Sequence, residues 1–153
     1  MKKMFFIRKI FIILLMLLAG SISPTVAQST LTPGSAINVA GKQRFLSQRM
    51  GKDYVFNVLG KQVDLATKEM QTSMILFDEN LKALKAYVPK STAALLTKEE
   101  TLWLEYRKLL VTKPTKESAQ AVLNANSQLL AATNDVVVDL VKWAATQPRR
   151  GSE

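Results

Sequence analysis

The 153-residue sequence contains no cysteine and no histidine. Their absence excludes disulfide bonds, Cys/His zinc sites, thiol chemistry and histidine-dependent catalytic triads, so packing alone must hold the fold. Asp135 and Asp139 are spaced i,i+4, which a solvated helix face explains. Glu99, Glu100 and Glu105 are interpreted in the same way. The sequence therefore predicts neither an enzyme nor a metal or other cofactor.

Proline and glycine are scarce, the prolines fall between apolar segments, and there is no alternating strand pattern. Apolar residues at steps of three and four predict helices. They run from Pro33 to about Leu59, from Val63 to Val88, from Ser91 or Thr92 (or from Thr97) to Val111, and from about Thr115 to the residue before Pro148. Short links make neighbouring helices antiparallel. We expect an all-α fold, an up-down-up-down antiparallel four-helix bundle.

The first 27 residues have the layout of a secretory signal peptide. Lys2, Lys3, Arg8 and Lys9 precede an apolar run over residues 10–19, and Thr25-Val26-Ala27 offers a cleavage site. An uncleaved signal anchor is the alternative. We expect a signal peptide at 1–27, one domain at 28–148 and a disordered tail at 149–153, in a periplasmic or secreted protein.

Removal of the signal segment would lower the formal charge from +9 to +5, because four of the 21 basic residues and none of the 12 acids would leave. The remaining basic residues are spread over all the expected helices. A nucleic-acid partner would need a basic patch or stripe. Nucleic acid is therefore not an expected partner.

The segment 37–50, I-N-V-A-G-K-Q-R-F-L-S-Q-R-M, stands out from ordinary helical sequence. On a helix, four residues of this segment and two beyond it fall on one stripe within about 60°: Ile37, Gly41, Arg44, Gln48, Val55 and Leu59. If this stripe faces the core, Arg44 needs a partner, because an unpaired buried charge is costly. The partner would be an acid on another helix (Asp64, Asp78 or Asp135), a second copy of the helix, or a bound anion.

The same segment resembles the signature of the PilJ-type domain at the N-terminus of type IV pilus methyl-accepting chemotaxis transducers. It is also similar to the periplasmic sensor domain of nitrate/nitrite sensor kinases. The pattern N-x-A-G-K-Q-R-x-L-S-Q-R, residues 38–49, carries the likeness, and F-D-E-N-L-K-A-L, residues 77–84, is a weaker second echo. The resemblance implies an all-helical extracytoplasmic module that binds a small anion between two protomers.

By this resemblance, Gly41 and Arg44 would line an anion site at a dimer axis, with Asn38 near its edge and Gln48 one turn further along. A guanidinium presents its donors in a rigid fork that suits planar oxyanions. The nitrate sensor kinases carry a lysine at the position of Val39, so this chain has one positive charge fewer there. The missing charge weakens the case for nitrate, and it leaves three alternatives: nitrite, another small anion, or no ligand.

Two functions follow as hypotheses. In the first, the chain is an exported sensory module that dimerises through its first helix, binds a small anion such as nitrate or nitrite, and signals through a separate membrane-bound partner. In the second, it is a non-catalytic structural or protein-interaction bundle in which Arg44 is paired internally.

Overall fold

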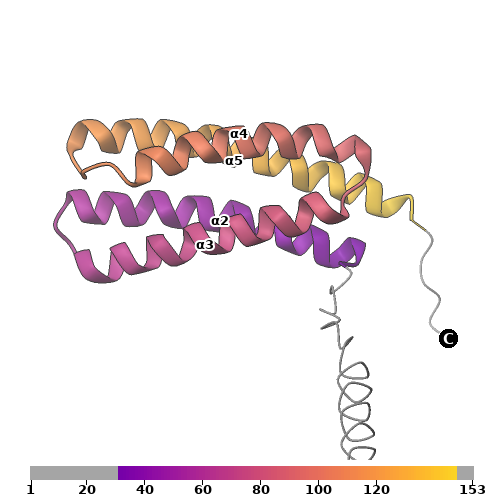
Figure 1. Cartoon of the computed structure of the whole chain (residues 1–153), viewed down its shortest axis with the longest axis horizontal. Helices are drawn as coiled ribbons and strands as arrows, with labels where there is room; N and C mark the ends of the chain where they lie inside the picture. Colours follow the sequence, from indigo (N-terminus) through magenta and orange to yellow (C-terminus); the bar gives the residue numbers. More distant parts are fainter. Residues whose placement is uncertain (1–30, 148–153) are drawn as a thin grey trace, which may run out of the picture.

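The computed structural model describes residues 31–147, which form an antiparallel bundle of four helices (Figure 1). The helices are α2 (Pro33–Val58), α3 (Val63–Tyr87), α4 (Lys90–Leu110) and α5 (Lys116–Ala145). No strand occurs among these residues. The predicted all-α four-helix bundle is confirmed. The predicted signal peptide (1–27) and tail (149–153), and the outer ends of the predicted 28–148 domain, lie outside the described residues.

Helices α2 and α5 each begin with a capping box. The Thr32 side chain accepts a hydrogen bond from the Ser35 backbone N–H, and the Ser35 hydroxyl oxygen accepts one from the Thr32 N–H. Thr115 and Ser118 make the same pair of bonds at the start of α5. Each pair satisfies two donors that a helix start would otherwise leave unpaired. The predicted starts of these two helices are confirmed.

The predicted start of the third helix is wrong. Helix α4 begins at Lys90, with Pro89 at the N-cap position, so neither Ser91, Thr92 nor Thr97 caps it. The Thr92 hydroxyl instead donates to Asp139 Oδ2 at 2.6 Å, across to α5. The Thr97 hydroxyl donates to the Ala93 carbonyl of its own helix. Threonine is a common capping residue, but these two hydroxyls form other hydrogen bonds instead.

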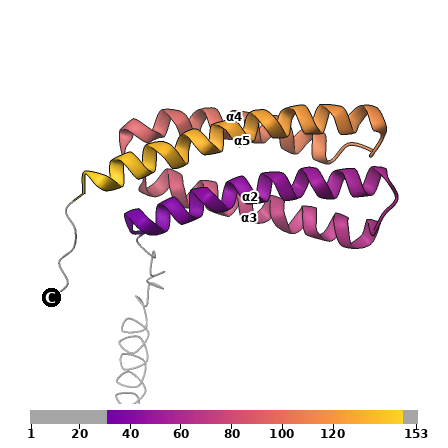
Figure 2. The same cartoon turned by 180° about the vertical axis from the view of Figure 1, so that it is seen from behind.

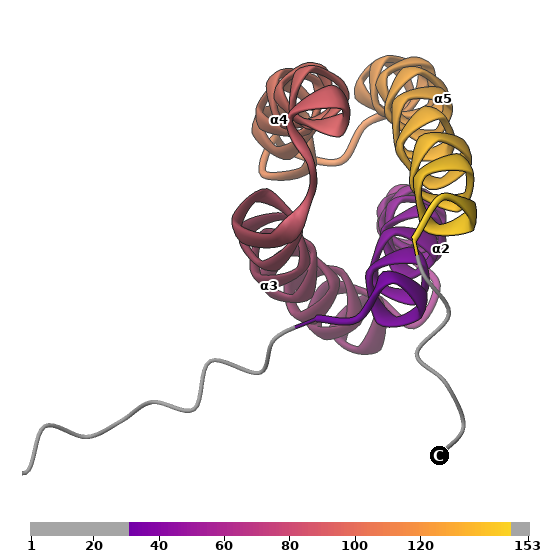
Figure 3. The same cartoon turned by 90° about the vertical axis from the view of Figure 1, so that its right-hand side faces the viewer.

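The four helices form a ring in which α2 lies between α3 and α5 and diagonally opposite α4 (Figure 3). Helices α2 and α4 therefore run in the same direction, and α3 and α5 run in the other. The first residues of α2 and the last residues of α5 lie at the same end of the bundle (Figures 1 and 2). None of the four helices combines the length and the apolar character that crossing a membrane requires.

The core is built from aromatic side chains on three helices and small residues on α2. Trp103, Tyr54, Tyr106 and Phe77 are the largest fully buried side chains. Besides Tyr54, helix α2 contributes these buried residues: Ala36, Ala40, Gln43, Leu46, Ser47, Met50, Gly51 and Asp53. The predicted core stripe of α3 is confirmed from Ala66 to Leu84. The small residues of α2 let its backbone approach its neighbours closely, and this determines which side of α2 faces outward.

Candidate functional site

The stripe predicted to face the core lies on the outside of the bundle. Arg44, Gln48 and Leu59 are exposed, and Gly41 is half-buried. The six residues do share one side of α2, as predicted. Ile37 and Val55 are half-buried, and Ile37 packs against the core, but most core contacts of α2 come from a neighbouring side of the helix. The prediction was wrong because Ile37, Val55 and Leu59 were taken as core markers. The buried side of α2 combines Leu46, Met50 and Tyr54 with small residues and Gln43, and hydropathy gives the small and polar members little weight.

The interpretation in which Arg44 is buried and paired with an internal acid is wrong within residues 31–147. There Arg44 makes no ion pair. Two of the three suggested acids have other partners: Asp78 binds Arg107 at 2.9 Å and Asp135 lies 3.7 Å from Lys98. The third, Asp64, lies exposed in the first turn of α3. Arg44 therefore offers its guanidinium outward.

Four cations lie on or beside the outward surface of α2: Lys42, Arg44, Arg49 and Lys52. Two of them are held by acids, since Arg49 Nη2 lies 2.7 Å from Glu69 and Lys52 Nζ lies 3.0 Å from Asp53. Lys42 and Arg44 have no such acid among the described residues. The surface therefore has a positive balance that a small anion complements.

An aromatic side chain lies within this charged surface. Phe45 is 61% exposed, although a phenylalanine is normally buried. Together with Gln48, Arg49, Lys52 and Glu69, it lines an open groove of about 500 Å³. We call the outward side of α2 over residues 38–52 the motif surface. A large apolar group beside positive charges is typical of a surface that contacts another molecule.

Asn126 anchors the motif surface to the core. Its amide nitrogen donates to the Ser47 carbonyl and to the Tyr106 hydroxyl, and its oxygen accepts from Gln48 Nε2 at 2.9 Å. Tyr106 in turn donates to the Ser47 carbonyl, and burial raises the pKa of its hydroxyl. These bonds join α2, α4 and α5. Together they form a polar layer that positions Gln48.

All four predicted site residues lie on the motif surface or along its edge. Asn38, Arg44 and Gln48 are exposed, and a Cβ atom added to Gly41 would meet no atom within 4 Å. Nothing in the described bundle therefore requires a glycine at position 41. A glycine there leaves room for a second helix or a ligand to approach the α2 backbone.

The two glycines of the motif helix should respond in opposite ways to alanine. Gly41→Ala is expected to stabilise the fold by about 0.5 to 1 kcal/mol, because alanine favours the helix and the site is open. Gly51→Ala is expected to destabilise it, because the new methyl would lie 3.2 Å from the Tyr106 hydroxyl and 3.5 Å from Asn126. Urea denaturation measures both. Equal effects from the two variants would contradict the assigned orientation of α2.

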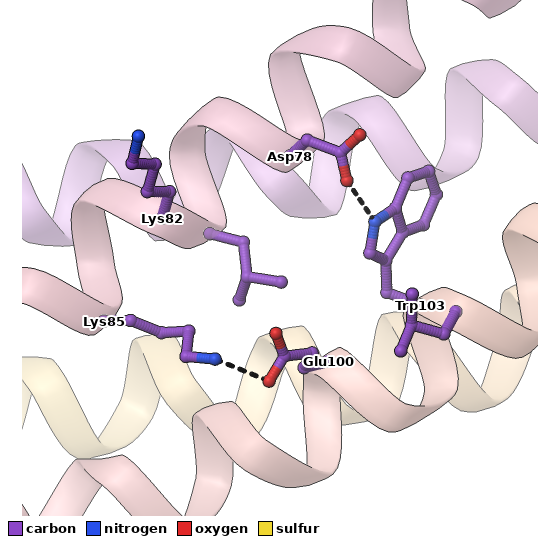
Figure 4. A pocket seen from close by; sticks show the side chains of 7 residues that line it. Asp78, Lys82, Lys85, Glu100 and Trp103 are labelled. Carbon is purple, nitrogen blue, oxygen red and sulfur yellow. Dashed lines mark hydrogen bonds and ion pairs between the residues drawn. The ribbon is translucent and has the colours of Figure 1, made fainter.

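Residues 77–84 of α3, the second segment that resembles the family, pack against α4. Phe77 stacks on Trp103 with ring centroids 4.4 Å apart, and Asp78 Oδ1 accepts from Trp103 Nε1 at 2.7 Å. Asp78, Lys82, Lys85, Glu100 and Trp103 line a groove of about 270 Å³ between the two helices, with Leu81 and Leu104 (Figure 4). In Figure 4 the Lys85 amine meets the Glu100 carboxylate, at 2.6 Å. This segment serves packing and leaves a groove at the α3–α4 junction.

Glu99 was predicted to lie on a solvated helix face, and this is wrong. It is fully buried, and neither carboxylate oxygen has a hydrogen-bond partner among the described residues. Burial raises the pKa of its carboxyl group to about 8. The sequence did carry a signal for this, because Glu99 follows Leu96 by three residues and precedes Trp103 by four, in step with the core stripe of α4.

No three acidic side chains within residues 31–147 come together in a way that would hold a metal ion. What the fold and this surface define is a helical bundle that presents a charged motif along the outside of its first helix. The chain belongs to the PilJ family, Type IV pili methyl-accepting chemotaxis transducer N-term, whose family model matches residues 26–134. No curated protein and no solved structure matches the chain significantly. The chain is therefore a sensory domain of the transducer type.

Proposed function

We propose that this chain is an exported sensory domain that binds a small anion, such as nitrate or nitrite, between the motif surfaces of two copies. The observation that carries the proposal is Arg44, an exposed guanidinium with no ion pair among the described residues. A lone guanidinium in water binds an anion weakly. Two of them facing each other across a dimer would exclude water from the anion and strengthen each contact.

The shape of the motif surface supports a second copy as the other wall of the site. Gly41 leaves the α2 backbone uncovered one turn before Arg44, and Phe45 projects next to it. A phenylalanine of this exposure would gain about 2 kcal/mol by burial. Two like-charged surfaces repel each other, however, and an anion between them would relieve that repulsion. Anion binding and dimer formation are therefore coupled in this proposal.

Export and signalling belong to the same proposal. The predicted signal segment would place residues 28–148 in the periplasm or outside the cell. The state of the bundle would then have to reach a separate membrane-bound partner. Such a partner would contact the end of the bundle at which α2 begins and α5 ends. This end includes α2, which carries the motif surface, and its neighbour α5 (Figures 1 and 2).

Thermal denaturation with a panel of anions tests the proposal: nitrate, nitrite, chloride, sulfate and small carboxylates at constant ionic strength. An anion at 100 times its dissociation constant stabilises the fold by about 2.7 kcal/mol, which shifts the midpoint by several degrees. We expect Arg44→Ala to abolish the shift while the unliganded midpoint stays nearly unchanged. The matched control is Lys108→Ala, an exposed cation on α4 on the opposite side of the bundle; it should keep the shift.

A flat panel would favour the second candidate function, in which the motif surface docks a protein partner without an anion. The exposure of Phe45 is the observation that supports this candidate. The two candidate functions also predict different effects of substitution. In the second, Phe45→Ala would abolish partner binding, and Arg44→Ala would change mainly the rate of association.

A further inference from the structure

Three buried side chains, Gln43, Asp53 and Glu99, have polar atoms without a hydrogen-bond partner among the described residues. Asp53 forms an ion pair with Lys52, which leaves Gln43 and Glu99 without any partner for these atoms. Glu99 on α4 and Gln43 on α2 are both fully buried, and both oxygens of Glu99 and both amide atoms of Gln43 lack hydrogen bonds to described residues. Such groups are rare in folded proteins, because each costs the free energy of its lost hydration. Four such atoms in one small core call for a physical explanation.

The two side chains lie in the same half of the core. Tyr106 on α4 donates to the Ser47 carbonyl on α2, which fixes the relative level of these two helices. Gln43 precedes Ser47 by one turn, and Glu99 precedes Tyr106 by two turns. Because α2 and α4 run in the same direction, both unpartnered groups lie on the same side of that bond, towards the helix N-termini.

No cation is available inside the core to compensate an ionised Glu99. The buried titratable residues are Asp53 and Tyr54 on α2 and Tyr106 on α4 itself, and the buried residues of α3 and α5 include none. Two lysines near Glu99 in the sequence of α4 and across the groove pair with other acids. Lys98 lies near Asp135, and Lys85 binds Glu100. A negative charge on Glu99 would therefore need water.

The sequence neighbours of Glu99 on α4 line a groove that is open to water. The groove between α3 and α4 is lined by Glu100, the next residue in sequence, and by Trp103, one turn further along the same helix (Figure 4). A modest rotation or outward movement of α4 would bring the Glu99 carboxylate towards this groove. The same movement would expose the Trp103 ring, which is now 1% exposed.

We propose that Glu99 is a proton-dependent switch in the bundle core: protonated, it remains packed between the helices, and when it ionises, α4 opens towards the α3–α4 groove. Burial raises the pKa of this carboxyl to about 8, so the change falls at mildly alkaline pH. Gln43 directly precedes Arg44 in α2, so a loosening of the core at this level reaches the motif surface. The domain would thereby respond to the pH outside the cell.

Tryptophan fluorescence tests the switch without any ligand. In a Trp143→Phe background Trp103 is the one remaining tryptophan. We expect its emission to shift to longer wavelength, and its quenching by acrylamide to increase, between pH 6 and 9 with a midpoint near 8. Glu99→Gln should abolish the change, and the matched control Glu105→Gln, at an exposed position of the same helix, should keep it. An emission that does not change with pH, or changes equally in Glu99→Gln, would overturn the proposal.

A second measurement needs no core variant. The carboxyl carbon-13 resonance of Glu99 should titrate with a midpoint near 8 in the intact protein, and a midpoint below 6 would overturn the switch. The coupling to anion binding rests on the proposed function and is measured separately, as anion affinity against pH. Because the fluorescence experiment contains no anion, a failure of the anion site and a failure of the switch give different results.

Discussion

Glu99→Gln is expected to raise the free energy of unfolding at pH 9 by up to about 5 kcal/mol, with the opening of α4 in the wild type relieving part of the cost of its buried charge. The folded-state pKa of about 8 lies above the ordinary value of 4.5. Between these two pH values the native state keeps a proton that the unfolded chain releases. The stability of the wild type therefore falls as pH rises through this window, and it levels off above about 8. Glutamine carries no charge and avoids this loss.

The measurement is urea denaturation of both proteins at pH 5, 7 and 9. The difference between them isolates Glu99, because all other titrating groups are shared. Glu100→Gln is the control, since Glu100 pairs with Lys85 near the surface and such pairs contribute about 1 kcal/mol or less. A Glu99→Gln protein with the same pH dependence as the wild type would show that Glu99 is hydrated in the native state.

Asn126→Ala is expected to cost about 2 to 4 kcal/mol, because it removes three hydrogen bonds and leaves buried groups less well satisfied. The loss should also free Gln48, so that anion-dependent stabilisation weakens along with the fold. Urea denaturation checks the first effect and thermal denaturation with anion the second. Asn124→Ala is the matched control, as this exposed asparagine bonds only Gln120 among described residues. Equal losses in the two variants would remove the anchoring role given to Asn126.

Much of the fold could be predicted from local patterns. The capping residues Thr32 and Thr115 and the three- and four-residue spacing on α3 identified the helices and their antiparallel order. The start of α4 was missed, because a threonine that fits a cap can equally bond another helix, as Thr92 does with Asp139. Competition of this kind depends on tertiary contacts that one sequence does not display.

The candidate site residues lie along one side of α2, as predicted, but this side is not the one that makes most of the core contacts. Periodicity shows that Gly41, Arg44 and Gln48 share a side of α2, but it does not show which side meets the core. That depended on small residues such as Ala36 and Ala40, whose value lies in close packing. Glu99 was missed because a glutamate is normally solvated, although its position in the core stripe of α4 pointed inward.

The central claim is that two copies hold an anion between their motif surfaces at Arg44. Sedimentation equilibrium of residues 28–153 with and without nitrate, and then nitrite, at constant ionic strength tests it most directly. The account predicts that one of these anions raises the dimer fraction and that Arg44→Ala abolishes the increase while remaining folded. A dimer fraction that no anion changes, or that changes equally in Arg44→Ala, would contradict the account.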